Sequence, residues 1–257
     1  MSKFTQNDWN EQFLKSCPLF FPLFAFGKPF AGFFYWPKIE DYNLMMPYPL
    51  KTWTGILLSF VEQKIKSRNK NVKSNLFENL YELRIFLTGM VNTRPNHWHD
   101  FFNMLVWYTF PKTKAALNMR QFIAFDENAE FPWHKPPRFR LREQDLMTIF
   151  DEGGCFIVEI IDLSKPLGQQ YVVLPFVFGH GVYEQLYLQN TEFSVCGYKI
   201  CLNLSHNYTS LLSVLEQIDI AASQKLSKRE IFSNEKIFYR ITVTELINML
   251  QETAHLS

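Results

Sequence analysis

The sequence predicts one α+β domain across residues 1–257, in which antiparallel hairpins pack around a buried helix at about residues 98–109. The chain has 257 residues, of which 47% are hydrophobic and 17% aromatic. A chain of this length can bury one substantial core, because single cores stop growing at roughly 250–300 residues. Runs with strand-like alternation and runs with helical spacing are mixed along the chain without an internal repeat. This mixture favours the α+β class.

The net charge and the cysteine content of the chain narrow the classes of binding partner and of cellular compartment that we expect. Twenty-six Lys and Arg against twenty-five Asp and Glu give a net charge of +1. The chain therefore has no strong global signal for nucleic acid or an anionic membrane. Its four cysteines form no CxxC pair, and no cleavable signal is recognised, so we expect a soluble, cytoplasmic protein with reduced thiols. The oligomeric state and any cofactor stay unknown.

The N-terminal part combines a short helix with an aromatic segment. Asn7 or Asp8 can cap a helix that ends before Pro18. Residues 17–36 are almost wholly apolar, but they include Lys28, three prolines and two glycines. A membrane-spanning helix needs about 20 apolar residues with internally bonded backbone groups. We therefore expect the segment to pack on the core, and no transmembrane segment is predicted.

Two strands and two helices are predicted next. The runs at Ile56–Lys66 and Tyr81–Thr88 alternate, which predicts strands joined by the basic segment Lys64–Lys73. This basic segment lacks the aromatics that stack on single-stranded bases and is interpreted as a solvated hairpin connection. Trp98–Tyr108 is predicted to be a helix, and Pro111 opens a second helix that reaches about Phe122.

The C-terminal half is predicted to begin with a loop and a hairpin. Asp126–Arg140 is rich in proline and charge and is predicted to be a loop. Met147–Phe150 and Cys155–Ile161 flank Asp151-Glu152-Gly153-Gly154, a composition that favours a tight turn between antiparallel strands. The later elements are a strand at Tyr171–Phe178, a helix at Val182–Leu188, strands near Lys199 and Phe238, and helices near Leu212 and Val243.

The helix at about residues 98–109 carries a polar wedge. With His99 as the origin, Asn103 lies at about 40° and Asp100 at about 100° around the helix axis. The remaining faces are apolar, which is typical of a buried helix. A buried polar wedge must find hydrogen-bond partners. Something polar is therefore expected to face it.

The segment Tyr81–Asn118 resembles the signature of domain-of-unknown-function family 3025, a bacterial family. The resemblance continues more loosely through the later acidic turn and the next histidine, and it spans about Leu57 to Tyr187. It implies membership of the family and no particular chemistry. The residues that carry it are Tyr81-Glu82, Gly89, Thr93-Arg94, Trp98-His99-Asp100, Asn103, Trp107, Phe110-Pro111, Lys114 and Leu117-Asn118, then Asp145, Asp151-Glu152-Gly153, Phe178-Gly179-His180 and Glu184.

Two functional hypotheses are open. The first is a hydrolase-like enzyme acting on an anionic or phosphate-containing substrate, in which His99 transfers a proton or holds a metal. The second is a non-catalytic binding or scaffold protein in which the wedge is a structural network. Whether the chain is an enzyme stays open. The candidate catalytic residues are His99, Asp100, Asn103 and His180, and the candidate ligand-binding residues for a small anionic ligand are Arg94, Lys112, Lys114, Asn118 and Asp145.

The spacing of the histidines in the sequence determines which of them could bind one metal ion together. His97 and His99 form an HxH pair, whose side chains diverge on a helix and share a face only in an extended chain. His180 and Glu184 are spaced i, i+4, so a helix that starts near Gly179 would bring them together. If that helix approached His99, a pocket with two histidines and several carboxylates would form. The sequence leaves the metal undetermined.

Overall fold

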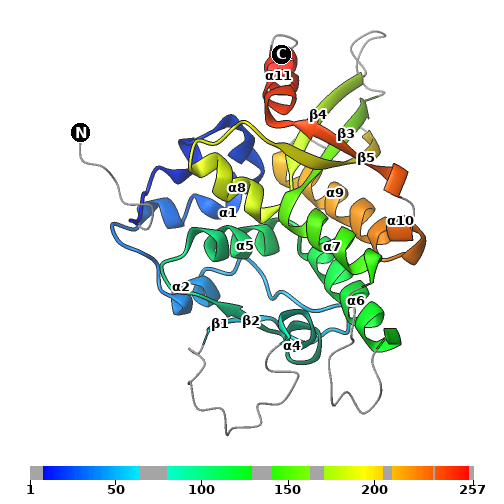
Figure 1. The fold of residues 1–257 in the computed structure, drawn as a ribbon. Coiled ribbons are helices and arrows are strands. Elements are labelled where there is room, and N and C mark those ends of the chain that lie inside the picture. Colours follow the sequence, from blue (N-terminus) through cyan, green and yellow to red (C-terminus); the bar gives the residue numbers. More distant parts are fainter. Residues whose placement is uncertain are drawn as a thin grey trace, which may run out of the picture.

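The computed structural model describes residues 8–63, 80–128, 141–162, 171–204, 210–233 and 235–254. The structure combines helices with one four-stranded sheet and a separate two-stranded sheet, which confirms the α+β class (Figure 1). The predicted basic connection Lys64–Lys73 and most of the predicted loop Asp126–Arg140 lie outside the described residues. The elements up to the second sheet strand are η1 (Phe13–Lys15), η2 (Pro18–Leu23), α1 (Phe24–Gly27), η3 (Phe30–Gly32), α2 (Ile39–Leu44), β1 (Ser59–Glu62), α4 (Tyr81–Thr88) and β2 (Met90–Thr93).

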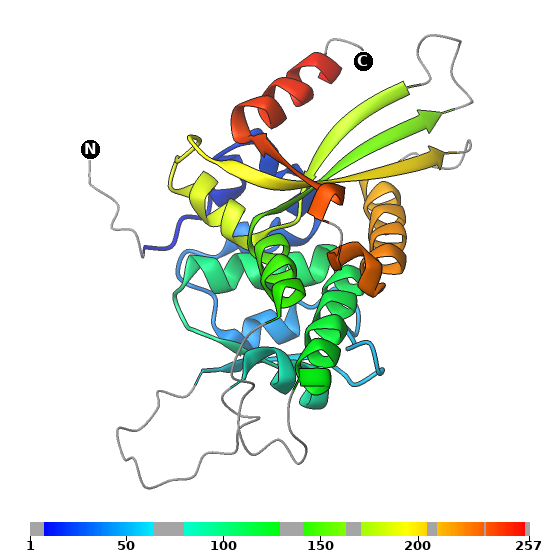
Figure 2. The ribbon, with the colours of Figure 1, turned by 45° about the vertical axis from the view of Figure 1, so that its right-hand side comes forward.

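The second half of the chain builds the larger sheet and its covering helices. Its strands lie in the order β4-β3-β5-β6, with β3 antiparallel to β4 and parallel to β5. Figure 2 shows β3, β4 and β5 extending beyond the helices on one side. The elements are α5 (Trp98–Thr109), α6 (Pro111–Asn128), α7 (Arg142–Gly153), β3 (Gly154–Asp162), β4 (Tyr171–Val177), α8 (His180–Tyr187), β5 (Ser194–Leu204), α9 (Leu211–Leu226), α10 (Arg229–Ser233), η4 (Glu235–Ile237), β6 (Phe238–Thr242) and α11 (Val243–Ala254).

Helix α5 lies in the centre of the core, as the sequence predicts. Ten of its residues are buried. The aromatic segment at residues 17–36 packs against it: the Phe20 ring lies 5.5 Å from Phe102, and the Phe30 ring lies 5.4 Å from Phe101. Within the described parts of the chain, no helix is both long enough and apolar enough to cross a membrane.

The prediction of a strand at Tyr81–Thr88 is wrong, because these residues form helix α4. Both Leu83 and Ile85 are buried, and the Phe86 ring stacks on Phe122 of α6 at 4.0 Å between centroids. Gly89 ends the helix with a φ of 72°, and its N–H donates to the carbonyl of Ile85. A glycine in this left-handed conformation is a common helix stop.

The predicted hairpin around Asp151-Glu152-Gly153-Gly154 is also wrong. Helix α7 continues through Asp151 and Glu152 to Gly153, and β3 begins directly at Gly154. The apolar residues Met147 and Phe150 are both buried, and their i, i+3 spacing suits one helix face. The antiparallel partner of β3 is β4, with Cys155 opposite Val177. The consequence is that Asp151 and Glu152 lie at the C-terminal end of a helix.

Helix α6 runs to Asn128, beyond the predicted end near Phe122, and its first turn is capped from α9. The Asp219 carboxylate accepts hydrogen bonds from the backbone N–H groups of Lys112 and Thr113 at 2.9 and 2.8 Å. These groups have no partner within the helix, and a carboxylate suits the positive end of the helix dipole. The cap fixes the start of α6 relative to α9.

Candidate metal centre

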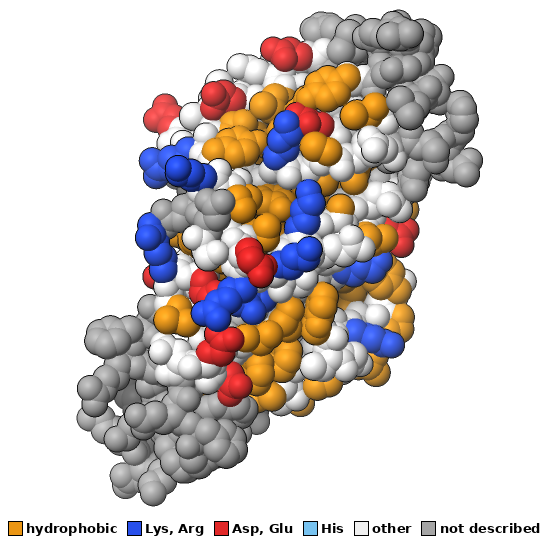
Figure 3. All heavy atoms as spheres, turned by 90° about the vertical axis from the view of Figure 1, so that its right-hand side faces the viewer, with side chains coloured by type: hydrophobic (Ala, Val, Ile, Leu, Met, Phe, Trp, Pro, Cys, Tyr) orange, Lys and Arg blue, Asp and Glu red, His pale blue; other side chains and the backbone are white. Residues whose placement is uncertain are grey.

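Three helix ends meet at one point of the fold. His99 is the second residue of α5, His180 is the first residue of α8, and Glu152 is the last residue but one of α7. Helix α8 packs against both α5 and α7 (Figure 1). Figure 3 shows a face of the molecule on which hydrophobic and basic side chains are mixed. No histidine is visible among the described side chains on that face. The convergence of these ends brings three potential metal ligands, two histidines and one glutamate, together from distant parts of the sequence.

Two glycines allow α7 and α8 to approach this closely. A Cβ atom on Gly179 would lie 2.4 Å from the backbone oxygen of Glu152, a distance that real Cβ atoms essentially never show. A Cβ atom on Gly181 would lie 3.0 Å from a side-chain oxygen of Glu152. The absence of a side chain at both positions therefore lets Glu152 lie beside His180.

Three ligand atoms form a small triangle. The Nε2 atoms of His99 and His180 are 3.1 Å apart, and Oε2 of Glu152 lies 3.7 and 3.3 Å from them. A point equidistant from three atoms with these separations lies about 2.0 Å from each. Zinc bonds to histidine nitrogen and carboxylate oxygen are roughly 2.0–2.2 Å long. The triangle therefore has the size that one metal ion requires.

The hydrogen bonds behind the two histidines fix which ring nitrogen faces the triangle without a proton. Nδ1 of His99 lies 2.9 Å from Oε2 of Glu184, and Nδ1 of His180 lies 3.0 Å from the backbone oxygen of Asp151. Both partners only accept hydrogen bonds, so each Nδ1 carries a hydrogen. In neutral imidazole the Nε2 atom is then a bare acceptor. When both histidines are neutral, three acceptor atoms therefore point at one another with no donor between them; a proton or a cation in the triangle relieves this.

Charge in the cluster favours a carboxylate at Glu152. Burial raises the pKa of Glu152, but a hydrogen bond with His180 and the charges of His180, His99 and Lys114 outweigh burial and bring it to about 2. Burial lowers the pKa of His99, whereas the bond to Glu184 and the carboxylates around it raise the pKa above its ordinary value. The site therefore attracts positive charge, either a proton or a cation.

The cluster is buried on one side and open on the other. The side chain of His180 is 5% exposed, that of His99 is 23% exposed and that of Glu152 is 45% exposed. Behind His180, Lys114 is buried and its Nζ lies 2.6 and 2.8 Å from the carboxylate oxygens of Asp151. This ion pair holds the end of α7 against α6. A ligand can reach the cluster from the Glu152 side.

The structure brings some of the predicted site residues together and places others elsewhere. His99 and His180 are brought together, and Lys114 reaches the site through Asp151. Asp100 accepts from the backbone and the guanidinium of Arg94, at 2.6 Å for the shortest side-chain bond. His97 lies outside the triangle, with its Nδ1 atom 3.9 Å from Asp100.

The remaining predicted residues are not among the three clustered ligand atoms. Asn103 donates to the Tyr81 hydroxyl at 2.8 Å, on the same side of α5 as His99. Asn118 donates to the backbone and the carboxylate of Glu82. The side chain of Lys112 is half exposed, near Glu216, and Asp145 is exposed on α7. The positions of Lys112 and Asp145 do not indicate which small molecule, if any, either residue would bind.

Glu152 is the candidate ligand that the sequence analysis does not identify. In the sequence, Glu152 stands in a predicted turn and among the residues that carry the family resemblance. The predicted turn does not place Glu152 in a helix. In the structure Glu152 lies near the end of α7, where it meets His99 and His180. An adjacent acidic pair near a second histidine was the available signal.

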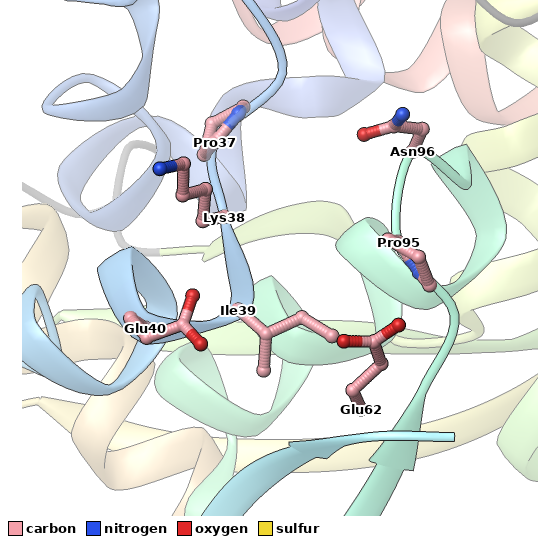
Figure 4. Close-up of a pocket in the computed structure, with 7 residues that line it drawn as sticks. All are labelled: Pro37, Lys38, Ile39, Glu40, Glu62, Pro95 and Asn96. Carbon is pink, nitrogen blue, oxygen red and sulfur yellow. The ribbon is translucent and has the colours of Figure 1, made fainter. Parts of the chain in front are cut away.

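A separate small pocket lies between the start of α2, the end of β1 and the turn after β2 (Figure 4). It has a volume of about 200 Å³. None of its lining residues belongs to the metal cluster, and none is among the described residues with a buried, unpartnered side-chain atom. Its lining residues are Pro37, Lys38, Ile39, Glu40, Glu62, Pro95 and Asn96.

The fold and the cluster together define an α+β protein with a candidate metal centre at the junction of three helices. The chain belongs to the family described as protein of unknown function (DUF3025), whose model matches residues 58–254. This match confirms the sequence resemblance and includes every member of the cluster. No curated protein and no solved structure is similar enough to match the chain.

Proposed function

We propose that this protein is a metal-dependent hydrolase in which His99, His180 and Glu152 hold one divalent ion, most simply Zn²⁺. The observation that carries the proposal is the triangle of three bare acceptor atoms, 3.1–3.7 Å apart, around a point about 2.0 Å from each. Two imidazoles and one carboxylate are a ligand set of catalytic zinc sites. Glu184 and the Asp151 carbonyl would supply the outer hydrogen bonds that orient such histidines.

Three protein ligands leave a coordination position for water, which is typical of catalytic rather than structural zinc. A zinc ion lowers the pKa of its bound water to about 7. A zinc ion held by these residues would supply activated water for hydrolysis at an electrophilic carbon or phosphorus: the water oxygen would bond to that atom, the bond to the leaving group would break, and the leaving group would depart with one proton of the water. Hydrolysis of this kind needs no other co-reactant. The half-exposed Glu152 side supports access by a substrate.

The charge of the substrate remains a prediction. Arg94 and Lys114 were expected to bind an anion, and both cations are engaged by Asp100 and Asp151. The metal itself would be the positive charge nearest a substrate. The proposed function therefore does not depend on an anionic substrate.

The alternative is a scaffold in which a proton, and not a metal, fills the triangle. One of the two histidines would then be charged and would donate to the other, with Glu152 and Glu184 balancing the charge. This alternative predicts a stable His-His hydrogen bond and no affinity for metal. The two readings therefore differ in a direct binding measurement.

Zinc binding tests the proposal. The purified protein, stripped with a chelator and titrated calorimetrically with Zn²⁺, is expected to bind one ion per chain. His180→Ala and Glu152→Gln should each weaken binding by about 100-fold or more, because each removes one of three ligands. The matched control is His97→Ala, which removes a histidine close to His99 but outside the triangle. Failure of the wild-type chain to bind Zn²⁺, Fe²⁺ or Mn²⁺, or an equal loss in His97→Ala, would contradict the metal centre.

Turnover tests the hydrolase part separately. Zinc-loaded protein is expected to hydrolyse at least one of two chromogenic probes, p-nitrophenyl acetate or bis(p-nitrophenyl) phosphate, and activity should disappear on chelation and return with Zn²⁺. Glu152→Gln should remain inactive after zinc addition. A chain that binds zinc but gives no metal-dependent turnover of either ester class would retain the metal centre and lose the proposed reaction.

A further inference from the structure

Ion pairs with buried cations join α6 to α7 near both ends of α7. Near the C-terminal end, Nζ of Lys114 lies 2.6 and 2.8 Å from the carboxylate oxygens of Asp151. Near the N-terminal end, Nη2 of Arg120 lies 3.2 Å from Oε2 of Glu143. Lys114 and Arg120 are 4% and 5% exposed. Both pairs connect the same two helices, but Asp151 directly precedes Glu152 of the metal cluster, whereas Glu143 lies about two turns earlier in α7.

The position of Asp151 in α7 is not one that favours a carboxylate. Asp151 and Glu152 are adjacent acidic residues in the last turn of α7, which has no basic residue. The C-terminal end of a helix carries partial negative charge, so a carboxylate is unfavourable there, whereas Glu143 in the first turn suits the helix dipole. A buried ion pair is itself weak evidence for stability, because the cost of removing its charges from water offsets much of their attraction. The pair of Lys114 and Asp151 therefore indicates a role other than stability alone.

The backbone of Asp151 connects this ion pair to two candidate ligands. Its carbonyl oxygen lies 3.0 Å from Nδ1 of His180 and accepts the hydrogen bond that leaves Nε2 of His180 facing the triangle. Glu152 is the next residue of α7. A movement of Asp151 would therefore displace the outer partner of one candidate ligand and the backbone of another.

Lys114 is held in place from two further helices. The Asp219 carboxylate of α9 accepts from two backbone N–H groups in the first turn of α6, which fixes the start of the helix that carries Lys114. On α5, the helix that carries His99, the centre of the Trp107 ring lies 5.4 Å from Nζ of Lys114. A cation at this distance is attracted to the face of the ring. Lys114 thus links the helix of His99 to the end of α7.

We infer that Lys114 and Asp151 are positioning residues of the metal centre. Their ion pair fixes the end of α7 relative to α5, so that Glu152 faces His99 and the Asp151 carbonyl orients His180. Groups that orient metal ligands without binding the metal usually contribute about 10–100-fold to metal affinity. The inference rests on the metal centre of the proposed function and is independent of the reaction.

A double variant tests the inference without leaving a buried charge unpaired. Lys114→Met/Asp151→Asn removes one positive and one negative charge, so the net charge around the triangle is unchanged, and asparagine keeps the backbone carbonyl and the shape of the side chain. Calorimetric titration with Zn²⁺ is expected to show an affinity about 10–100-fold below that of the wild type. Unchanged zinc affinity in this variant would overturn the positioning role.

The matched control is Arg120→Met/Glu143→Gln, which removes the other ion pair between the same helices. This control should keep the zinc affinity of the wild type, because Glu143 lies about two turns from Asp151. Chemical denaturation of the zinc-free proteins measures how much stability each double variant loses. Equal losses of zinc affinity in the two double variants would overturn the inference, because they would show a general effect of α6–α7 packing.

Bound Co²⁺ gives a second readout, which a purely structural role would not change. The visible absorption of Co²⁺ depends on the number and arrangement of its ligands. Lys114→Met/Asp151→Asn saturated with Co²⁺ should give a spectrum different from that of the wild type, and Arg120→Met/Glu143→Gln should give the wild-type spectrum. Identical spectra in all three proteins would overturn the positioning role.

Asp151→Asn alone is the milder variant, because its amide oxygen can still accept a hydrogen bond from Lys114. It should lose about tenfold in zinc affinity. If the double variant does not fold, unchanged zinc affinity and an unchanged Co²⁺ spectrum in Asp151→Asn would overturn the inference. The wild type decides the metal centre itself: no binding of either ion would contradict the metal centre and this inference together. Normal binding by the wild type and by every variant would remove the positioning role alone.

Discussion

Glu184 would influence the proposed metal centre without contacting the metal. Its Oε2 atom lies 2.9 Å from Nδ1 of His99 and therefore keeps the proton on that nitrogen. The hydrogen bond with His99 lowers the pKa of Glu184 more than burial raises it, so the carboxylate is charged. A charged acceptor makes the opposite ring nitrogen a stronger ligand. Glu184 is thus a positioning residue in the proposed site.

Glu184→Gln is expected to weaken Zn²⁺ binding by about 10–100-fold, the usual effect of removing an outer hydrogen-bond partner of a ligating histidine. Glutamine can still accept from Nδ1 but brings no charge. Competition against a chromogenic chelator measures the change. The control is Glu192→Gln, which neutralises an exposed carboxylate in the turn after α8. Equal zinc affinity in wild type and Glu184→Gln would contradict this positioning role.

At the residue scale, part of the candidate site could be predicted from sequence. The i, i+4 spacing of His180 and Glu184 indicated that both would share a pocket with His99 if their helix approached, and the structure brings them together. The partners of Arg94 and Lys114 could not be foreseen, because ion pairing depends on which helices pack together. The candidate ligand Glu152 could not be predicted for the same reason, because its position depends on how α7 packs against α8.

At the element scale, local patterns failed where tertiary contacts decided the outcome. The alternation in Tyr81–Thr88 suits a strand, but packing of Phe86 on Phe122 and the glycine stop at Gly89 favour a helix. Gly153 and Gly154 suggested a tight turn, yet the first ends α7 and the second begins β3. Helix α5 was predictable because its apolar residues surround a narrow polar wedge and bury almost every face.

The close approach of α7 and α8 is expected to fail if Gly179 gains a side chain. Gly179→Ala would place a Cβ atom against backbone atoms of Glu152 and Gly154, which cannot move aside as a flexible side chain can. We expect a loss of about 1–3 kcal/mol in the free energy of unfolding, typical of overpacking, together with weaker Zn²⁺ binding. Chemical denaturation and calorimetry measure the two effects.

The matched control for this change is Gly32→Ala in η3, where an added Cβ atom would meet nothing within 4 Å. This variant should keep both its stability and its zinc affinity. Unchanged zinc affinity in Gly179→Ala would show that the spacing of α7 and α8 does not set the position of Glu152 relative to His180.

At the scale of the whole molecule, the candidate metal centre joins segments that the chain order keeps apart. The described helices and the larger sheet share one hydrophobic core, to which α5, α7 and α8 each contribute buried residues. The ends of these three helices meet where the core gives way to polar side chains. A metal ion at that point would link elements from three parts of the sequence, so it would oppose unfolding as well as bind substrate.

Zinc is therefore expected to stabilise the whole fold. Because the ligands converge only in the folded chain, a free Zn²⁺ concentration of about 100 times its Kd should add roughly 2.7 kcal/mol to the free energy of unfolding. For a chain of this size that corresponds to a rise in Tm of roughly 5–10 °C, which a chelator should reverse. Differential scanning calorimetry of the stripped and zinc-loaded protein measures the shift. Glu152→Gln, which keeps the shape of the side chain and loses its charge, should show little shift. An equal rise in this variant would place the stabilising zinc elsewhere, whereas no rise in the wild type would favour a proton between His99 and His180.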